Sequence, residues 1–100
     1  CISSAASDVY KRQVHMHVVG RVQGVGFRFM TKHLADQLKI TGWVKNSLDG
    51  SVEIEAQGPN EILKQFIQGV KASPSPSGRV DKLVVKEIPS FQAREFLVKY

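Results

Sequence analysis

The sequence predicts a small α+β domain in which two helices lie on one face of an antiparallel β-sheet. Two observations carry this prediction. Segments with strand-like alternation and segments with helical spacing follow one another in the order β-α-β-β-α-β, with a short fifth strand at the end. The 100 residues are 42% apolar, which is enough for one core, and no apolar run approaches the ~20 residues that span a membrane.

The first strand and the first helix are marked by two different apolar periods. A strand is predicted over residues 14–19, because apolar side chains alternate there with two histidines. A helix is predicted from Phe27 to about Lys39, because apolar residues recur at helical spacing: Phe27, Met30, Leu34 and Leu38. Three glycines lie between or next to these two elements.

A hairpin and a second helix follow. Strands are predicted over residues 41–46 and 51–56, joined by a turn at Asp49-Gly50. Gly58-Pro59 ends the second of these strands. The next helix is predicted to begin with Asn60 as its capping residue, followed by an apolar face made of Ile62, Leu63, Phe66, Ile67 and Val70.

The last third of the chain completes the predicted sheet. A loop rich in serine and proline over residues 73–78 precedes a strand at residues 80–88, which Pro89 ends. Residues 96–100 form the short fifth strand, which we expect at an edge of the sheet. The resulting βαββαβ order is that of a ferredoxin-like sandwich. This fold serves many functions, so the site must decide between them.

Residues 1–13 are small and polar and show no periodicity. They lack the apolar core of a secretory signal. We predict that they form a disordered, non-native leader and that the domain spans residues 14–100. The single cysteine, Cys1, excludes an internal disulfide framework and favours a reducing compartment, so we expect a cytoplasmic protein.

The stretch that points to chemistry is the glycine-rich loop between the first strand and the first helix. Gly24 and Gly26 allow a turn in which successive N–H groups face one point. Arg28 then falls in the first helical turn, where the helix dipole disfavours a cation, and residues 27–35 contain no acid. A bound anion between Arg28 and the loop amides would resolve this conflict.

Two sequence patterns resemble the acylphosphatase family. The first is Gly-Arg-Val-Gln-Gly-Val-Gly-Phe-Arg at residues 20–28. The second is Gly-Trp-Val-Lys-Asn at residues 42–46, followed by Gly50-Ser51-Val52 and Gly58. The element order and the ending at residues 96–100 extend the resemblance over nearly all of the chain after the leader. One departure is Lys99, where the family more often has arginine.

The resemblance implies hydrolysis of small acyl phosphates to a carboxylate and inorganic phosphate, with no metal or other cofactor. It implies that Asn46 positions the attacking water and that Arg28 holds the phosphate together with the loop amides. The substrate-binding residues that it implies are Gln23, Gly24, Val25, Gly26, Phe27 and Arg28. We expect a monomer that contacts neither nucleic acid nor membrane.

The chemistry of the substrate agrees with this set of residues. The leaving carboxylate of an acyl phosphate has a conjugate acid with a pKa near ~4, so it departs without a proton. A phosphate ester of an alcohol has a far more basic leaving group and hydrolyses much more slowly. An arginine, backbone amides and one carboxamide therefore suit the easier leaving group.

Other functions are less compatible with the same residues. The loop lacks the lysine of a Walker loop and the third glycine of a dinucleotide-binding loop. Phe27 and Phe29 superficially resemble an aromatic RNA-binding signature, but that signature must lie on a central strand, and here it begins a helix. A domain cut from a larger maturation enzyme of the carbamoyl-transfer type would share the same patterns.

The remaining singled-out side chains have simpler interpretations. His15 and His17 share a strand face, but they lack a third metal ligand nearby in the sequence, so we predict no metal site. We expect His33 on the exposed side of its helix and Arg21 in solvent. Trp43 is expected to pack on the sheet rather than to stack on a substrate.

Overall fold

The computed structural model describes residues 11–24, 26–73, 78–89 and 94–99. Their elements are β1 (Lys11–Arg21), α2 (Phe27–Leu38), β2 (Thr41–Asn46), β3 (Val52–Pro59), α3 (Asn60–Lys71), β4 (Arg79–Glu87) and β5 (Phe96–Lys99). This order confirms the predicted βαββαβ succession with a fifth strand. Neither α2 nor α3 is long and apolar enough to cross a membrane.

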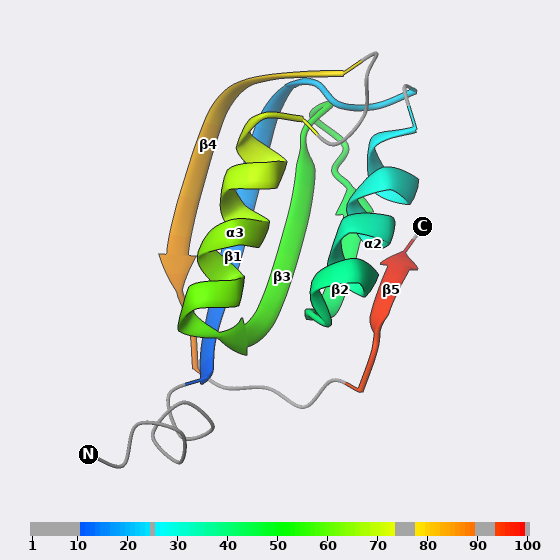
Figure 1. The fold of residues 1–100 in the computed structure, drawn as a ribbon. Coiled ribbons are helices and arrows are strands. Elements are labelled where there is room, and N and C mark those ends of the chain that lie inside the picture. The colour runs from blue at the N-terminus through cyan, green and yellow to red at the C-terminus, as the bar shows by residue number, and fades with distance from the viewer. Residues whose placement is uncertain (1–10, 25, 74–77, 90–93, 100) are drawn as a thin grey trace, which may run out of the picture.

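The five strands form one sheet in the order β4-β1-β3-β2-β5, with β4 and β5 at opposite edges (Figure 1). The pairs β1–β3, β1–β4 and β2–β3 are antiparallel, as predicted, but β5 runs parallel to β2. The sheet is therefore mixed rather than purely antiparallel. Alternation within a strand of four residues indicates which face is buried and carries no information about direction.

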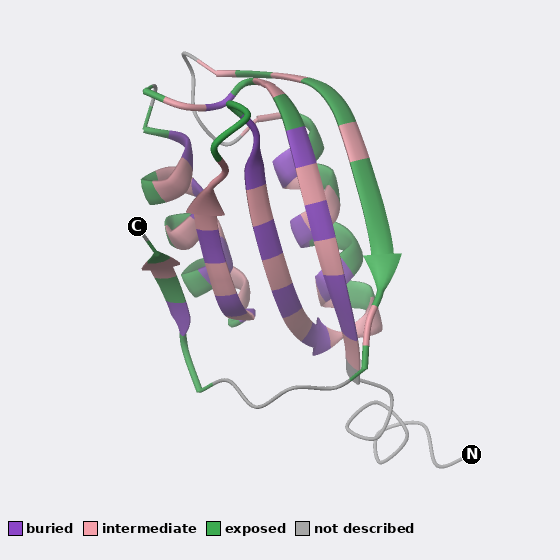
Figure 2. Ribbon diagram, turned by 180° about the vertical axis from the view of Figure 1, so that it is seen from behind, coloured by how far each residue is buried: buried purple, intermediate pink, exposed green. Residues whose placement is uncertain are grey.

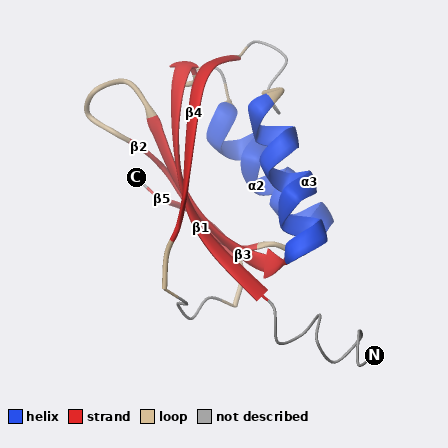
Figure 3. Ribbon diagram, turned by 90° about the vertical axis from the view of Figure 1, so that its left-hand side faces the viewer, coloured by secondary structure: helices blue, strands red, loops and turns tan. Residues whose placement is uncertain are grey.

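Both helices lie on the same face of the sheet, and no helix among the described residues covers the opposite face (Figure 3). Buried and half-buried residues alternate along β2 and β3, as Figure 2 shows, because only the helical side is sealed from water. Phe66 of α3 packs edge-on against Phe96 of β5, with ring centroids 5.8 Å apart. This contact joins α3, which lies over β1 and β3, to the edge strand β5 on the α2 side of the sheet.

The first strand begins earlier than the sequence suggested. Lys11 pairs with Pro59 of β3, so residues 11–13 belong to the sheet and not to a leader. These residues lack apolar alternation, and their strand state follows from the length of β3, which offers partners as far as Pro59. The rest of the predicted leader, residues 1–10, lies outside the described part of the chain.

The predicted capping role of Asn60 is wrong. Asn60 is the first residue of α3, Pro59 takes the capping position, and no side chain caps this helix. The Oδ1 atom of Asn60 instead accepts a hydrogen bond of 2.7 Å from Nη1 of Arg12, whose Nε lies 2.8 Å from the Glu87 carboxylate. The side chain that could have capped α3 thus forms a hydrogen bond with Arg12 of β1 instead.

Candidate active site

The turn between β1 and α2 depends on left-handed backbone conformations. Gly24 and Gly26 both have φ of 75°, and no atom of the described residues other than their chain neighbours lies within 4 Å of where a Cβ would stand on either. The demand for glycine is therefore conformational rather than spatial. Gly26 stands at the N-terminus of α2, and its carbonyl accepts the first helical hydrogen bond, 3.0 Å from the Met30 nitrogen.

Arg28 extends from the first turn of α2, which contains no acidic residue. Its Nη1 atom donates a hydrogen bond of 2.9 Å to the backbone oxygen of Lys99 in β5. A carbonyl has no formal charge, so this bond orients the guanidinium without itself neutralising it. The edge strand β5 thereby helps to fix the cation beside the N-terminus of the helix.

Asn46 is the last residue of β2 and pairs with Val52 of β3. Its side-chain Oδ1 is buried and has no hydrogen-bond partner among the described residues. A buried carboxamide oxygen without a partner is costly, on the order of 1–3 kcal/mol. Such an atom is suited to accept a hydrogen bond from a molecule that enters the site.

The glycine-rich turn, Arg28 and Asn46 line one pocket of about 210 Å³. The described residues around it are Val22, Gly24, Gly26, Phe27, Arg28, Phe29, Asn46 and Val98. The fold therefore brings together both side chains singled out from the sequence. Val25 lies outside the described residues, and the side chain of Phe27 is 1% exposed, so it belongs mainly to the core, as expected.

Gln23 has a role that the sequence did not reveal. Its side-chain Nε2 donates hydrogen bonds of 2.8 Å to the backbone oxygens of both Ser47 and Ser51. These residues flank the turn that follows Asn46. The side chain of Gln23 therefore connects the glycine-rich loop to the β2–β3 turn. This connection helps to fix the position of the loop relative to Asn46, which directly precedes the turn.

Two carboxylates stabilise the β2–β3 turn from its other side. Ser47 Oγ donates to Glu53 at 2.5 Å, and Ser51 donates to Asp49 through both its N–H, at 3.0 Å, and its Oγ, at 2.5 Å. The hydrogen bond from Ser47 lowers the pKa of Glu53, against the effect of burial. The bonds from Ser51 lower the pKa of Asp49 in the same way.

The histidines of β1 lie on the open face of the sheet. The ring nitrogens of His15 are 3.3 Å from Glu53 and 3.1 Å from Glu55, and His17 lies 3.9 Å from Asp49. No group of three or more potential metal ligands occurs within residues 11–24, 26–73, 78–89 and 94–99. His15 thus contacts two carboxylates of β3, whereas Nε2 of His17 has no hydrogen-bond partner among the described residues.

Trp43 packs on the same open face. Its ring meets the ring of His15 edge-on at 6.2 Å, and the ammonium groups of Lys45 and Lys99 lie 5.5 and 4.9 Å from its centroid. This confirms the expected sheet packing. His33 is exposed on α2, also as expected.

The RNA-binding reading fails on geometry. Phe27 and Phe29 both belong to α2 and not to a strand, and Phe27 is buried. Stacked bases need aromatic rings side by side on the face of a sheet. These two rings cannot form that surface.

An α+β sandwich that presents a glycine-rich turn, an arginine and a carboxamide to one pocket is a scaffold suited to binding a small anion. The acylphosphatase family model matches residues 14–98. The acylphosphatase of Pediococcus pentosaceus is 66% identical over 89 residues, which cover 89% of this chain and 99% of that protein. The chain belongs to the acylphosphatase family and is an acylphosphatase, a hydrolase acting on acid anhydrides.

Solved structures agree with this assignment. The crystal structure of acylphosphatase from Bacillus subtilis superposes with a TM-score of 0.84 at 44% identity, over 88% of this chain and 98% of that one. A structure of full-length HypF in a phosphate- and nucleotide-bound form gives 0.80 at 26% identity, over 90% of this chain and 12% of HypF. The same domain thus occurs within a much longer protein.

Proposed function

We propose that the protein hydrolyses small acyl phosphates in the pocket between the glycine-rich turn and the end of β2, without a metal ion or other cofactor. Arg28 and the backbone amides of residues 23–28 hold the phosphoryl group, and Asn46 orients the attacking water. The observation that carries this proposal is that Arg28 and Asn46, from different elements, line one small pocket.

The role of Arg28 follows from its shape and charge. The planar guanidinium presents parallel N–H donors that match two phosphate oxygens. Each charge-assisted hydrogen bond contributes roughly 1.5–3 kcal/mol. The N-terminus of α2 adds partial positive charge at the same place. Together they favour a phosphoryl group whose negative charge is spread over its outer oxygens.

The role of Asn46 is positioning. A carboxamide has no useful basicity, but its Oδ1 accepts a hydrogen bond from water and holds the water in line with the bond that breaks. The water oxygen forms a bond to phosphorus while the bond from phosphorus to the acyl oxygen breaks, and the carboxylate leaves with the electron pair. The described lining residues include no acid and no histidine. We therefore assign the proton of the water to a phosphate oxygen of the substrate.

The test is an assay of benzoyl phosphate hydrolysis with chelator and without added metal, on the wild type and three variants. Arg28→Ala is expected to weaken inhibition by inorganic phosphate and to lower kcat/KM by about 100-fold or more. Arg28→Lys should not restore full activity, because a point charge lacks the planar fork. Asn46→Ala should lower kcat by a similar factor while phosphate still inhibits at nearly the wild-type concentration.

Two results would contradict these assignments. One is loss of wild-type activity in chelator that returns with added zinc or magnesium. The other is an Asn46→Ala variant that no longer binds phosphate but turns over bound substrate at the normal rate.

We also propose that the protein acts as a monomer in the cytoplasm. A single cysteine in 100 residues supports a reducing compartment, and a chain of this size can form its own core. Light scattering after size-exclusion chromatography should give the monomer mass, and fractionation of the source cells should place the protein with cytoplasmic markers.

A further inference from the structure

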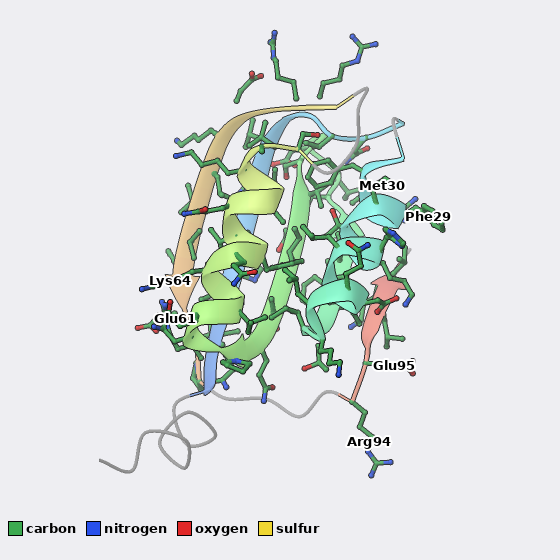
Figure 4. All side chains as sticks on the ribbon, viewed as in Figure 1. Phe29, Met30, Glu61, Lys64, Arg94 and Glu95 are labelled. Atoms are coloured by element: carbon green, nitrogen blue, oxygen red, sulfur yellow. The ribbon has the colours of Figure 1, made fainter. Side chains whose placement is uncertain are left out.

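Phe29 is the residue after Arg28, and its side chain is 70% exposed. All of α2 is described, and the other large apolar residues of this helix are buried or half-buried. Figure 4 shows the ring projecting from the start of α2, away from α3. Phe29 thus departs from the apolar face that packs α2 onto the sheet.

Exposure of a single apolar side chain is common and is not evidence of a function. The position of Phe29 is the informative feature, because it lines the same pocket as Arg28 and Asn46. Three further apolar residues line that pocket: Val22, Phe27 and Val98. The pocket therefore combines a small polar part with an apolar wall and an aromatic rim.

An acyl phosphate has the same two parts. Its phosphoryl group is dianionic, and its acyl group is attached through one bridging oxygen and points away from phosphorus. When Arg28 and the loop amides hold the phosphoryl group, the acyl group must lie against the rest of the lining or in the mouth of the pocket. Val98, which is half-buried, and the exposed ring of Phe29 are the described lining residues placed to meet it.

We infer that Phe29, with Val98, forms a subsite for the acyl group that favours acyl phosphates with an apolar, above all aromatic, acyl part over acetyl phosphate. This inference rests on the proposed function. A ring on the rim offers a flat apolar surface for stacking, and it displaces water from the acyl group without touching the reacting atoms.

The effect should appear mainly in KM. A contact remote from phosphorus binds the substrate and the transition state about equally, so it changes kcat little. A single apolar contact in a pocket changes kcat/KM by about tenfold or more. For Phe29 we expect a change of only about tenfold, because its side chain remains partly exposed to water.

The experiment measures kcat and KM for benzoyl phosphate and for acetyl phosphate on the wild type, Phe29→Ala, Phe29→Leu and Leu97→Ala. Leu97 is the matched control: it is 46% exposed, lies on β5 beside Trp43 in the register of β2, and does not line the pocket. Phe29→Ala is expected to lower the preference for benzoyl over acetyl phosphate by about tenfold, through a higher KM for benzoyl phosphate. Phe29→Leu should retain part of the preference, and Leu97→Ala should retain all of it.

An unchanged preference in Phe29→Ala would overturn the inference, as would an equal loss on both substrates or an equal effect of Leu97→Ala. If the proposed function were wrong, the result would differ: Arg28→Ala would hydrolyse both substrates at the wild-type rate, regardless of the results for the Phe29 variants. Because Phe29 is exposed, its replacement does not threaten folding, and a thermal melt of each variant checks this.

Discussion

Gly26 shapes the site through its backbone. Gly26 is the N-cap residue of α2, where the chain changes from turn to helix, and its φ is 75°. Gly26→Ala is expected to lower the free energy of unfolding by about 1–2 kcal/mol, the cost of a left-handed conformation for an L-residue. Gly26→Asn should cost less, because asparagine tolerates this conformation and also caps helices. Urea unfolding of the two variants gives both values, and an alanine variant as stable as the wild type would contradict the argument.

Gln23 acts on a different part of the site. Gln23→Ala removes two hydrogen bonds to the β2–β3 turn, each contributing about 0.5–1.5 kcal/mol to stability. We expect kcat to fall by more than the affinity for inorganic phosphate, since the turn begins directly after Asn46 and helps to position it, whereas the loop amides stay in place. Gln37→Ala, an exposed change on α2, is the control. A loss of stability with an unchanged kcat would show that Gln23 is purely structural.

At the residue scale the sequence was most informative where a local rule was broken. A cation at the start of a helix without an acid nearby drew attention to Arg28. Only the second family pattern, at residues 42–46, points to Asn46. The side-chain role of Gln23 could not be predicted, because its partners are backbone oxygens 24 and 28 residues away, and a backbone oxygen has no signature in the sequence.

At the scale of elements, the β2–β3 hairpin holds a pH-sensitive contact. Ser47, His15, Lys45 and His17 together keep the pKa of Glu53 below its ordinary value near 4.5. The unfolded chain therefore takes up a proton on this carboxyl more readily than the folded one, and this part of the stability is lost as the pH falls below about 5. Glu53→Gln should reduce stability at pH 7 and flatten its decline toward pH 3.

The matching measurement is chemical unfolding of the wild type, Glu53→Gln and Glu95→Gln between pH 3 and pH 7. Glu95 is exposed and provides a carboxylate control outside the hairpin. A Glu53→Gln variant whose stability declined with acid as steeply as that of the wild type would argue against the contact.

Most elements with a clear apolar period were predictable within a residue or two, but β3 continues to Pro59, three residues beyond its predicted end, so that Gly58 and Pro59 belong to the strand. The direction of β5 was not predictable, because the strand with which its four residues pair, β2, lies more than 50 positions earlier in the chain, and that pairing is set by the whole sheet. The early start of β1 was missed for a related reason. Residues 11–13 are strand because β3 continues opposite them, not because of their own pattern.

At the scale of the whole molecule, an anion that binds only the folded protein should stabilise it. Inorganic phosphate at about 100 times its Kd adds about 2.7 kcal/mol to the free energy of unfolding. Arg28→Ala should lose most of this gain. The measurement is thermal melting in phosphate against sodium chloride of equal ionic strength. Equal stabilisation of the wild type and Arg28→Ala would place the anion elsewhere.

The hydrogen bond from Arg28 to the carbonyl of Lys99 joins residues 71 positions apart. During translation the ribosome releases the glycine-rich turn and Asn46 well before it releases β5. The guanidinium gains this anchor only when that late segment has emerged from the exit tunnel and docked beside β2. A nascent chain arrested before Phe96 should therefore be a poor catalyst, so that hydrolytic activity begins only after β5 has been synthesised.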